Sequence, residues 1–380
     1  MTLINAPYPA SRPRRLRRTD FSRRLVREHQ LTVDDLIYPV FVLDGQNQRQ
    51  AVGSMPGVER LSLDLLLPVA EDCVKLGIPV MALFPVIDSS LKDPEGNEAL
   101  NPNGLVPTVV RALKKHFPDL GVMTDVALDP FTSHGQDGWL DESGYILNDL
   151  TLAQLVKQAM VQAEAGVDIV APSDMMDGRI GYLRDELDNN GFENTGIMAY
   201  TAKYASAFYG PFRDALNSAP KKGDKKTYQM DFRNTREALL EAELDYNEGA
   251  DFLMVKPALH YMDVIKSLKD SFNIPIAAYH VSGECAMLSA ACKNGWLDFN
   301  KAMPEEVNRI ACDHMSTLLF TPTTTGFDNL KREGFNLQST EKATVNSPRV
   351  YHCGDVMYDN SLYFSSVSDS KSPILKEIGL

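Results

Sequence analysis

The sequence has few cysteines, no long hydrophobic run and a deficit of positive charge. The five cysteines among 380 residues are scattered without a CxxC pair, which disfavours a disulfide framework and fits a reducing cytoplasm. They are Cys73, Cys285, Cys292, Cys312 and Cys353. No apolar run reaches the length of a membrane span, and the first residues lack the apolar core of a secretion signal. The formal net charge of −13 argues against a nucleic-acid partner. From the cysteine pattern and the lack of a span or secretion signal, we expect a cytoplasmic protein.

One segment contrasts with this acidic balance. Residues 12–27 carry eight arginines. From the residues alone this segment is a transit peptide, a basic arm that docks on an acidic neighbouring subunit, or a solvated tail. The chain as a whole has 44% hydrophobic and 23% charged residues, which is typical of one large or two ordinary globular domains.

Short apolar runs alternate with amphipathic segments along the chain. Seven runs are strand candidates: 38–43, 79–86, 121–128, 167–173, 196–201, 251–257 and 275–281. Most are almost continuously hydrophobic, as expected for strands covered on both faces. The alternation predicts an α/β protein with a parallel sheet, and seven units over roughly 250 residues favour a (β/α)8 TIM barrel. One unit of such a barrel is not accounted for by these runs.

A lysine ends one of these apolar strands. Residues 253–261 read LMVKPALHY, so Lys256 follows three apolar residues. A buried lysine tends to lose its proton and becomes a nucleophile, although a lysine at a strand end can also extend to solvent. Lys203 follows the preceding strand, and catalytic groups of TIM barrels lie at the C-terminal ends of strands. Two ammonium groups in one pocket disfavour each other's protonation, so the pair predicts an amine nucleophile.

Carboxylates and one imidazole follow the third strand candidate. Asp125, Asp129, His134 and Asp137 form a set that suits a hard ion such as Mg²⁺, while a polar loop with capping aspartates is the alternative. Residues 209–229 contain proline, glycine and five basic residues. This segment predicts either a mobile lid that carries cations to a carboxylate substrate or a plain solvated loop.

Six motifs carry a resemblance to a known family. They are DVALDPFTSHGQDG, APSDMMDGR, YTAKYASAFYGPFRDA, YQMDF, MVKPALHY and HVSGE. From about Arg14 to about Met303 the chain resembles the 5-aminolevulinate dehydratases, also called porphobilinogen synthases. The resemblance implies a hydro-lyase with a TIM-barrel fold. Such an enzyme condenses two 5-aminolevulinate molecules, with loss of two waters, to porphobilinogen, a precursor of tetrapyrroles such as heme.

The resemblance also implies roles for individual residues. Lys256 would form a Schiff base with one substrate, while Lys203 would bind the second substrate and lower the pKa of Lys256. The other substrate contacts would come from Asp125, Ser173 and Asp174 in the pocket, from Arg213, Lys225 and Gln229 at one carboxylate, and from Ser282 at the other.

The expectations for metals and assembly rest on the same resemblance. Many members hold a catalytic zinc on three cysteines, at positions where this sequence has Ala127, Asp129 and Asp137. We therefore expect no catalytic zinc, and the two aspartates are candidate Mg²⁺ ligands. Glu237 matches the allosteric Mg²⁺ position of the family. The arginine-rich segment matches the arm that wraps a neighbouring subunit in a homo-octamer, which disfavours the transit peptide.

After about Met303 the resemblance changes. The motifs PEEVNR, LLFTPT, NLKREGF and GDVMYD resemble a non-hydrolysing UDP-N-acetylglucosamine 2-epimerase, in which Glu305 would serve in catalysis. The tail of 78 residues covers a fragment of that family and lacks the rest of its site. The sequence thus resembles a chimera with an oligomerisation arm at 1–35, a barrel at 36–302 and an epimerase-like tail at 303–380.

The tail predicts a helix at 304–315, a strand at 316–322 and a helix at 324–335, the order of the missing barrel unit. We predict that Leu318–Phe320 fills the eighth strand position, because an open barrel would expose two strand edges. The substrate-contacting tyrosine of the family's eighth strand is not supplied, so weakened binding is expected. Residues 337–349 read as a connector and 369–380 as a short helix.

Four functions remain open from the sequence. The first is a porphobilinogen synthase, either active or crippled by the foreign tail. The second is an epimerase fragment, disfavoured because its site is incomplete. The third is another Schiff-base aldolase, disfavoured because such an enzyme needs one lysine and no cationic lid. The fourth is a non-catalytic barrel.

Overall fold

A computed structural model describes residues 9–221, 223–312 and 318–320 of the chain. The chain divides into two compact units, Met1–Leu31 and Thr32–Leu380. The first unit contains the short helices α1 (Arg14–Arg17) and α2 (Asp20–Leu25). Thr19 precedes α2, and its hydroxyl lies 2.8 Å from that of Ser22, which helps to start the helix. Within this unit α2 exposes the apolar side chains Phe21 and Leu25.

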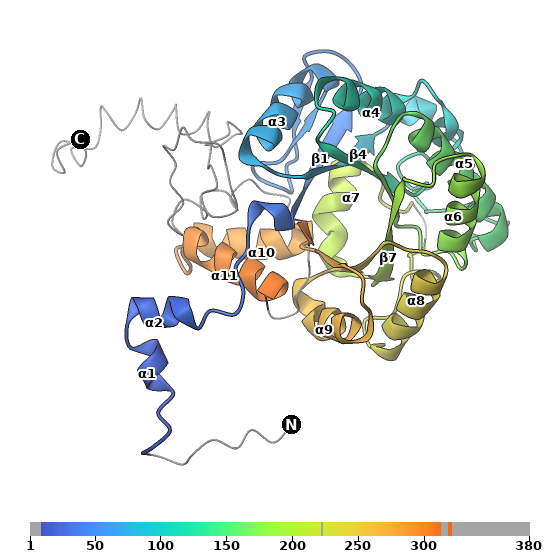
Figure 1. Cartoon of the computed structure of the whole chain (residues 1–380). Coiled ribbons are helices and arrows are strands. Elements are labelled where there is room, and N and C mark those ends of the chain that lie inside the picture. Colours follow the sequence, from blue (N-terminus) through green and yellow to red (C-terminus); the bar gives the residue numbers. More distant parts are fainter. Residues whose placement is uncertain (1–8, 222, 313–317, 321–380) are drawn as a thin grey trace, which may run out of the picture. The chain divides into compact units, whose positions relative to one another are not determined.

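Among the described residues of the second unit, eight parallel strands form a closed ring (Figure 1). The strands are β1 (Leu36–Leu43), β4 (Val80–Val86), β5 (Gly121–Val126), β6 (Ile169–Pro172), β7 (Gly196–Lys203), β8 (Phe252–Lys256), β9 (Ile276–Tyr279) and β10 (Leu318–Phe320). A small hairpin of β2 (Arg49–Ala51) and β3 (Glu59–Leu61) extends from β1. The predicted (β/α)8 TIM barrel is therefore confirmed.

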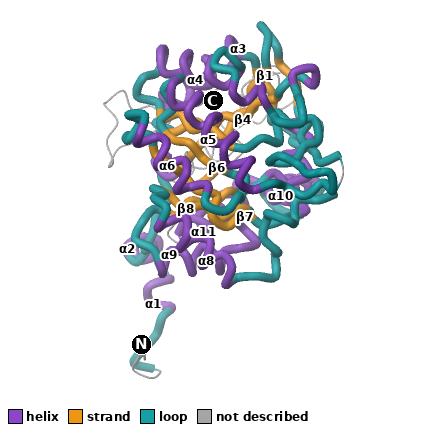
Figure 2. The backbone as a smooth tube through the Cα atoms, turned by 90° about the vertical axis from the view of Figure 1, so that its right-hand side faces the viewer, coloured by secondary structure: helices purple, strands orange, loops and turns teal. Residues whose placement is uncertain are grey.

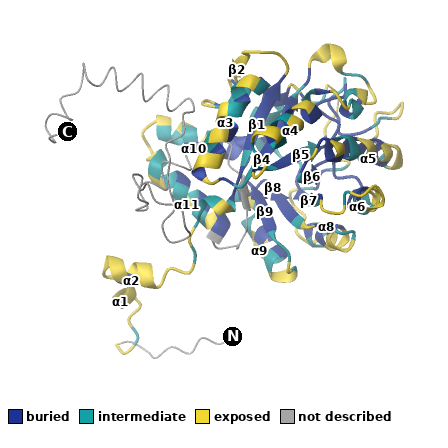
Figure 3. Ribbon diagram, turned by 45° about the horizontal axis from the view of Figure 1, so that its top comes forward, coloured by how far each residue is buried: buried dark blue, intermediate teal, exposed yellow. Residues whose placement is uncertain are grey.

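Helices lie outside the strands (Figure 2), and their buried residues lie on the side that faces the strands (Figure 3). They are α3 (Leu63–Leu76), α4 (Leu105–His116), α5 (Asn148–Glu164), α6 (Arg179–Asn189), α8 (Arg236–Asn247), α9 (Met262–Ser271), α10 (Ser282–Lys293) and α11 (Phe299–Cys312). In α4 the buried Val106, Val109, Val110 and Leu113 follow the i, i+3, i+4, i+7 spacing of one helical face. Each fully buried side chain of this kind contributes about 1.5–3 kcal/mol. None of the helices in the described part of the chain is long and apolar enough to cross a membrane.

A further helix, α7 (Gly210–Leu216), lies across the opening of the barrel (Figure 1). Its Phe212 ring packs 5.5 Å from the ring of Phe41 on β1 and 5.2 Å from that of Phe84 on β4. The predicted lid at 209–229 thus contains a helix that is anchored in the core, in addition to irregular chain. The apolar residues of GPFRDAL give α7 this buried face, a signal that the reading of the segment as a loop missed.

The tail supplies the eighth strand, as predicted. Leu319 of β10 pairs with Leu36 of β1 on one side and with Ala278 of β9 on the other. The preceding helix α11 begins at Phe299, five residues before the predicted start at Pro304. The Asp298 carboxylate accepts a hydrogen bond from the backbone N–H of Asn300 at 3.0 Å, which favours this earlier start. The predicted helix at 324–335, the connector and the last helix lie outside the described residues.

Candidate active site

Two lysines meet at the C-terminal ends of neighbouring strands. Lys203 ends β7, Lys256 ends β8, and the two residues are direct partners in the ladder between these strands. Both side chains are buried, with 6% of Lys203 and 5% of Lys256 exposed. The apolar residues before each lysine are buried in the barrel strands, and this burial places both ammonium groups in the interior. The structure therefore brings the predicted pair together.

Aromatic rings surround the amine of Lys256. Its Nζ lies 4.4 Å from the ring centre of Tyr279, 4.8 Å from Phe212, 5.1 Å from Tyr200 and 5.4 Å from Tyr209. Burial, together with the positive charge of Lys203, lowers the pKa of Lys256 to about 7. The rings partly stabilise a cation but offer no carboxylate to hold the proton. At neutral pH a substantial share of this amine is therefore unprotonated and nucleophilic.

Lys203 has polar partners that Lys256 does not have among the described residues. Its Nζ donates a hydrogen bond to the backbone carbonyl of Ser173 and lies 4.0 Å from Oδ1 of Asp137. Ser173 follows β6 and Asp137 lies in the loop after β5, so Lys203 contacts residues that follow two neighbouring strands. The two amines thus have different surroundings, one mainly aromatic and one polar, which suits them to different tasks.

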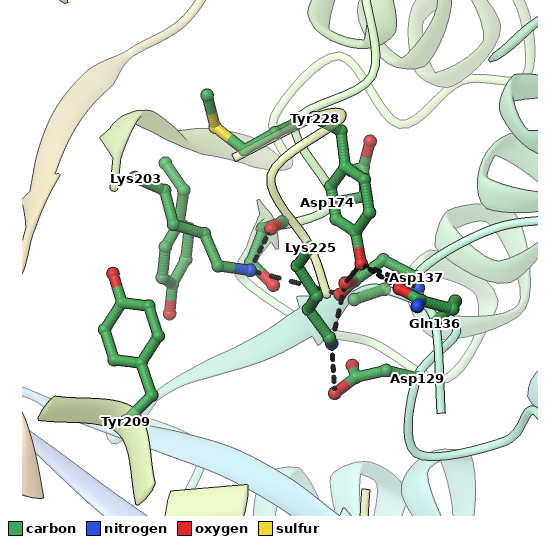
Figure 4. Close-up of polar contacts among 12 residues, drawn as sticks. Asp129, Gln136, Asp137, Asp174, Lys203, Tyr209, Lys225 and Tyr228 are labelled. Atoms are coloured by element: carbon green, nitrogen blue, oxygen red, sulfur yellow. Dashed lines mark hydrogen bonds and ion pairs between the residues drawn. The ribbon is translucent and has the colours of Figure 1, made fainter. Parts of the chain in front are cut away.

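A lid lysine lies between two aspartates of the β5 loop (Figure 4). The ammonium of Lys225 is 3.2 Å from Oδ2 of Asp129 and 2.7 Å from Oδ2 of Asp137, which also accepts a hydrogen bond from the Tyr228 hydroxyl. Burial alone would raise the pKa of Asp137, but the charges of Lys225 and Lys203 lower it to about 2. Burial outweighs the attraction of Lys225 at Asp129 and raises its pKa. The site therefore holds Lys225 mainly through an ionised Asp137.

Two further carboxyl groups at the strand ends have pKa values above the ordinary range of a carboxyl group. Burial raises the pKa of Asp125, on β5, to about 6, although Lys203 opposes the shift. Burial also raises the pKa of Asp174 to about 6, against the attraction of Arg179. Oδ1 of Asp125 and Oδ2 of Asp174 are buried and have no hydrogen-bond partner among the described residues. Groups with such pKa values can give and take protons near neutral pH.

The remaining predicted substrate contacts lie at the lid and at the end of β9. Arg213 and Gln229 line a cavity of about 800 Å³ together with Lys225. Ser282, the first residue of α10, is buried, and its hydroxyl accepts a hydrogen bond from the backbone N–H of Phe212 at 3.0 Å. Ser282 does not line this cavity. The three lid residues therefore lie together at the cavity, whereas Ser282 contacts α7.

The candidate metal ligands do not form a cation site in this arrangement. No group of three His, Cys, Asp or Glu side chains that could hold a metal ion occurs in the residues that the structure describes. Between Asp129 and Asp137 the Lys225 ammonium already supplies the positive charge. Glu237 lies in the first turn of α8 and accepts a hydrogen bond from the Asn234 amide at 2.7 Å. The predictions of Mg²⁺ and of no zinc both stay predictions.

Several polar groups of the barrel were not found from the sequence. Arg179 is buried and forms an ion pair of 3.1 Å with Asp245, whose carboxylate also accepts a hydrogen bond from the Thr201 hydroxyl. His280, after β9, lies 2.6 Å from the Glu306 carboxylate on α11. These contacts join residues 26 to 66 positions apart, so local patterns carry no signal for them.

Fold and site together define a (β/α)8-barrel enzyme with a buried lysine pair. Comparison with known proteins identifies its family. The sequence profile of the Delta-aminolevulinic acid dehydratase family matches residues 10–317. The delta-aminolevulinic acid dehydratase of Bradyrhizobium diazoefficiens is 60% identical over 299 residues, which is 78% of this chain and 84% of the relative. That of Synechocystis sp. is 50% identical over 301 residues, which is 78% of this chain and 91% of the relative.

A solved structure agrees with these relatives. The crystal structure of delta-aminolevulinic acid dehydratase (porphobilinogen synthase) from Toxoplasma gondii ME49, in complex with the reaction product porphobilinogen, superposes with a TM-score of 0.82. It is 47% identical and covers 85% of this chain and 91% of that chain. The chain therefore belongs to the delta-aminolevulinic acid dehydratase family, and the predicted enzyme class, a lyase, is confirmed.

The tail also matches as predicted. The profile of the UDP-N-acetylglucosamine 2-epimerase family matches residues 294–379. The two matched ranges overlap at 294–317, so all of α11 lies in both of them. Glu305, the predicted catalytic residue of the epimerase family, is exposed on α11. The resemblance to two families is thus confirmed at the level of sequence.

Proposed function

We propose that this chain condenses two molecules of 5-aminolevulinate to porphobilinogen through a Schiff base on Lys256. The observation that carries the proposal is the buried amine of Lys256, with a pKa lowered to about 7, at the end of a barrel strand and beside a second buried lysine. The names of the relatives support the substrate, because they are delta-aminolevulinic acid dehydratases.

The first step uses the unprotonated amine of Lys256. Its lone pair adds to the keto carbon of one substrate, and the resulting carbinolamine loses water to give an iminium. The iminium draws electrons from the neighbouring carbon and so activates it toward the second substrate. The rings of Tyr200, Phe212 and Tyr279 exclude water from this position and stabilise the cationic iminium.

Lys203 and two carboxyl groups supply the remaining chemistry in this proposal. Lys203 binds the second substrate, and its charge favours the unprotonated form of Lys256. Asp125 and Asp174 have pKa values near 6, so each can pass a proton during carbinolamine dehydration or ring closure. Overall two substrates join, two waters leave, and no oxidant or reductant is required.

The carboxylates of the substrates would be bound at two places. Arg213 and Gln229, which line the lid cavity, hold one of them, and Ser282, buried at the start of α10, holds the other. The lid lysine Lys225 stays near the reacting groups through Asp129 and Asp137. Fixing both substrates by their carboxylates turns an encounter in solution into an oriented reaction within the site.

Metal use and assembly are part of the proposal. Because Lys225 lies between Asp129 and Asp137, we assign no step to a catalytic metal. Glu237 is the candidate ligand of an allosteric Mg²⁺, which would act on assembly and not on the reacting atoms. The exposed Phe21 and Leu25 of α2 give the arm an apolar surface for a second copy of the chain, in keeping with a homo-octamer.

Product formation from 5-aminolevulinate tests the proposal. We expect turnover in the full-length protein and a loss of at least about a thousandfold in Lys256→Ala. Lys115→Ala, which changes an exposed lysine of α4, is the matched control and should retain activity. Assays with Mg²⁺, with zinc and with a chelator test the metal expectations.

Borohydride reduction followed by peptide mass mapping locates the Schiff base. The substrate adduct should lie on the peptide that contains Lys256. A folded protein that forms no product would support the alternative, a synthase crippled by its chimeric tail. If the protein turned over a UDP-sugar and formed no porphobilinogen, both the active synthase and the inactive synthase would be contradicted, even if an adduct were found.

A further inference from the structure

Three buried glutamines form a row along one face of α5. Gln154, Gln158 and Gln162 follow the i, i+4, i+8 spacing of a helical face, and their exposed fractions are 3%, 1% and 2%. The buried face of a barrel helix usually carries apolar side chains, as it does in α4. A buried amide group is unfavourable unless it is hydrogen-bonded, so the partners of these side chains indicate what the row does.

Two of the glutamines bind the backbone that leads from β5 into the site. Nε2 of Gln162 donates a hydrogen bond to the carbonyl of Asp125 at 3.0 Å, and its Oε1 accepts one from the Thr124 hydroxyl at 2.8 Å. Nε2 of Gln158 donates a hydrogen bond to the carbonyl of Ala127 at 3.2 Å. The helix thus holds the chain at the point where β5 ends and the loop with the site carboxylates begins.

These hydrogen bonds occur where the sheet stops holding one side of β5. The carbonyl of Val126 points toward β6 and accepts the backbone N–H of Ser173 at 3.1 Å. Since successive carbonyls alternate in direction along a strand, the carbonyls before and after Val126 point toward the β4 side. The ladder between β4 and β5 ends at Thr124, and beyond it the glutamine amides supply the donors for these two carbonyls.

The segment held in this way carries the carboxyl group of Asp125. The charges of Lys203 and Lys256 both lower the pKa of this carboxyl group against the effect of burial, so the group lies close to the lysine pair. Its Oδ1 is buried and has no hydrogen-bond partner among the described residues. The place of this oxygen in the site therefore depends on the backbone that carries it.

Gln158 satisfies the loop but not itself. Its Oε1 is buried and has no hydrogen-bond partner in the part of the chain that the structure describes. A buried acceptor without a donor lowers stability, and a methionine of similar length would avoid this cost. The amide of Gln158 thus contributes more to the position of the Ala127 carbonyl than to the packing of α5.

We propose that Gln158 and Gln162 are positioning residues for the reaction, because they hold the backbone at Asp125 and Ala127 and so keep the Asp125 carboxyl group directed at the lysine pair. The inference rests on the proposed function, in which Asp125 passes a proton. Neither glutamine touches the substrate in this arrangement. Their loss should therefore lower kcat and leave KM almost unchanged.

Steady-state kinetics of three full-length variants test the proposal. Gln158→Met and Gln162→Met keep the length of the side chain and remove its amide. We expect each to lower kcat about tenfold or more and to change KM less than about twofold, since a small displacement of a reacting group is costly. Gln154→Met is the matched control, because the Gln154 amide binds the Glu95 carbonyl at 3.2 Å and Oδ1 of Asn97 at 3.3 Å instead of the β5 backbone. It should leave kcat and KM within about twofold.

Thermal denaturation separates positioning from stability. Gln154→Met removes two buried hydrogen bonds and Gln158→Met removes one, so the Tm of the control should fall at least as far as that of Gln158→Met. A loss of kcat that follows the loss of Tm across the variants would overturn the positioning role, and so would an unchanged kcat in Gln158→Met. Should Gln162→Met fail to fold, Gln158→Met and its control carry the comparison.

Acylation of Lys256 tests the same role without turnover. The Asp125 carboxylate raises the pKa of Lys256 against burial, so displacing it should move the midpoint of the acylation rate to lower pH. We expect this shift in Gln158→Met and in Asp125→Asn but not in Gln154→Met. A midpoint that moves in Asp125→Asn alone would overturn the positioning role. Absence of product in the unaltered chain would overturn the proposed function, while the shift in Gln158→Met would still support the positioning of Asp125.

Discussion

At the scale of single residues, the reactivity of Lys256 follows from the low pKa of its amine, which leaves part of the amine unprotonated at neutral pH. Burial and the neighbouring Lys203 charge lower the pKa of this amine to about 7, and the surrounding rings stabilise the cation only in part. An amine-specific acylating reagent should therefore modify Lys256 fastest above pH 7, with the rate falling about tenfold per pH unit below it.

The same measurement separates the two causes of the shift. Lys203→Met removes the neighbouring positive charge and leaves the burial unchanged, so the pKa of Lys256 should rise. The midpoint of the rate profile then moves to higher pH, and at pH 7 modification becomes slower. Peptide mass mapping reports the rate at Lys256, with exposed lysines of the same protein as internal references. A midpoint that stays in place would show that the charge of Lys203 has no influence.

The lysine pair could be predicted from the sequence, but its surroundings could not. Two consecutive apolar strands each end near a lysine. In a parallel barrel such strands are neighbours and end on the same face, so the two amines are expected to lie close together. The rings around Lys256 come from β7, from the lid and from β9, so residue spacing does not bring them together. The position of Lys225 between Asp129 and Asp137 likewise depends on how the lid folds back over the β5 loop.

At the scale of elements, the His280–Glu306 contact joins the end of β9 to α11. His280 is 1% exposed, and the Glu306 carboxylate lies 2.6 Å from its Nε2. Glu306→Ala would leave this buried nitrogen without its partner, at a cost of about 1–3 kcal/mol in the free energy of unfolding. Thermal denaturation should show a lower Tm than for the unaltered chain.

The adjacent glutamate provides a matched control for this contact. Glu305 lies on the same helix but is exposed, so Glu305→Ala should change the free energy of unfolding by less than about 0.5 kcal/mol. Equal Tm values for the two variants would mean that the contact between β9 and α11 does not stabilise the barrel. Tyr279, which contacts Lys256, precedes His280, so we also expect Glu306→Ala to lower kcat more than Glu305→Ala does.

The barrel elements were predictable because covered parallel strands leave long apolar runs, as in the fully buried Leu253, Met254 and Val255. The start of α11 and the helix α7 were not, because Pro304 and Gly210 read locally as helix breakers. Asp298 at one helix and the packing of Phe212 at the other outweigh these local signals. The start of α11 was thus set by a local cap, and α7 by a tertiary contact.

At the scale of the whole molecule, closure of the ring depends on a segment that matches the epimerase family and lies outside the range matched to the dehydratases. The dehydratase match ends at residue 317, and β10 occupies Leu318–Phe320. Without β10 the edges of β1 and β9 would both carry unpaired N–H and C=O groups. A strand needs little sequence identity to fill such a position, because the backbone makes the pairing and many apolar side chains suit a covered strand.

A single substitution tests whether this closure holds the enzyme together. Leu319 pairs with Leu36 and Ala278, and proline at this position removes a backbone N–H from the ladder, while Leu319→Val keeps it. We expect Leu319→Pro to lower the free energy of unfolding by at least about 1–3 kcal/mol and to reduce product formation, with Leu319→Val near the unaltered chain. Denaturant unfolding and the porphobilinogen assay measure the two effects. If Leu319→Pro matches Leu319→Val in both, the ring does not depend on β10, and activity must then be carried by a barrel of seven strands.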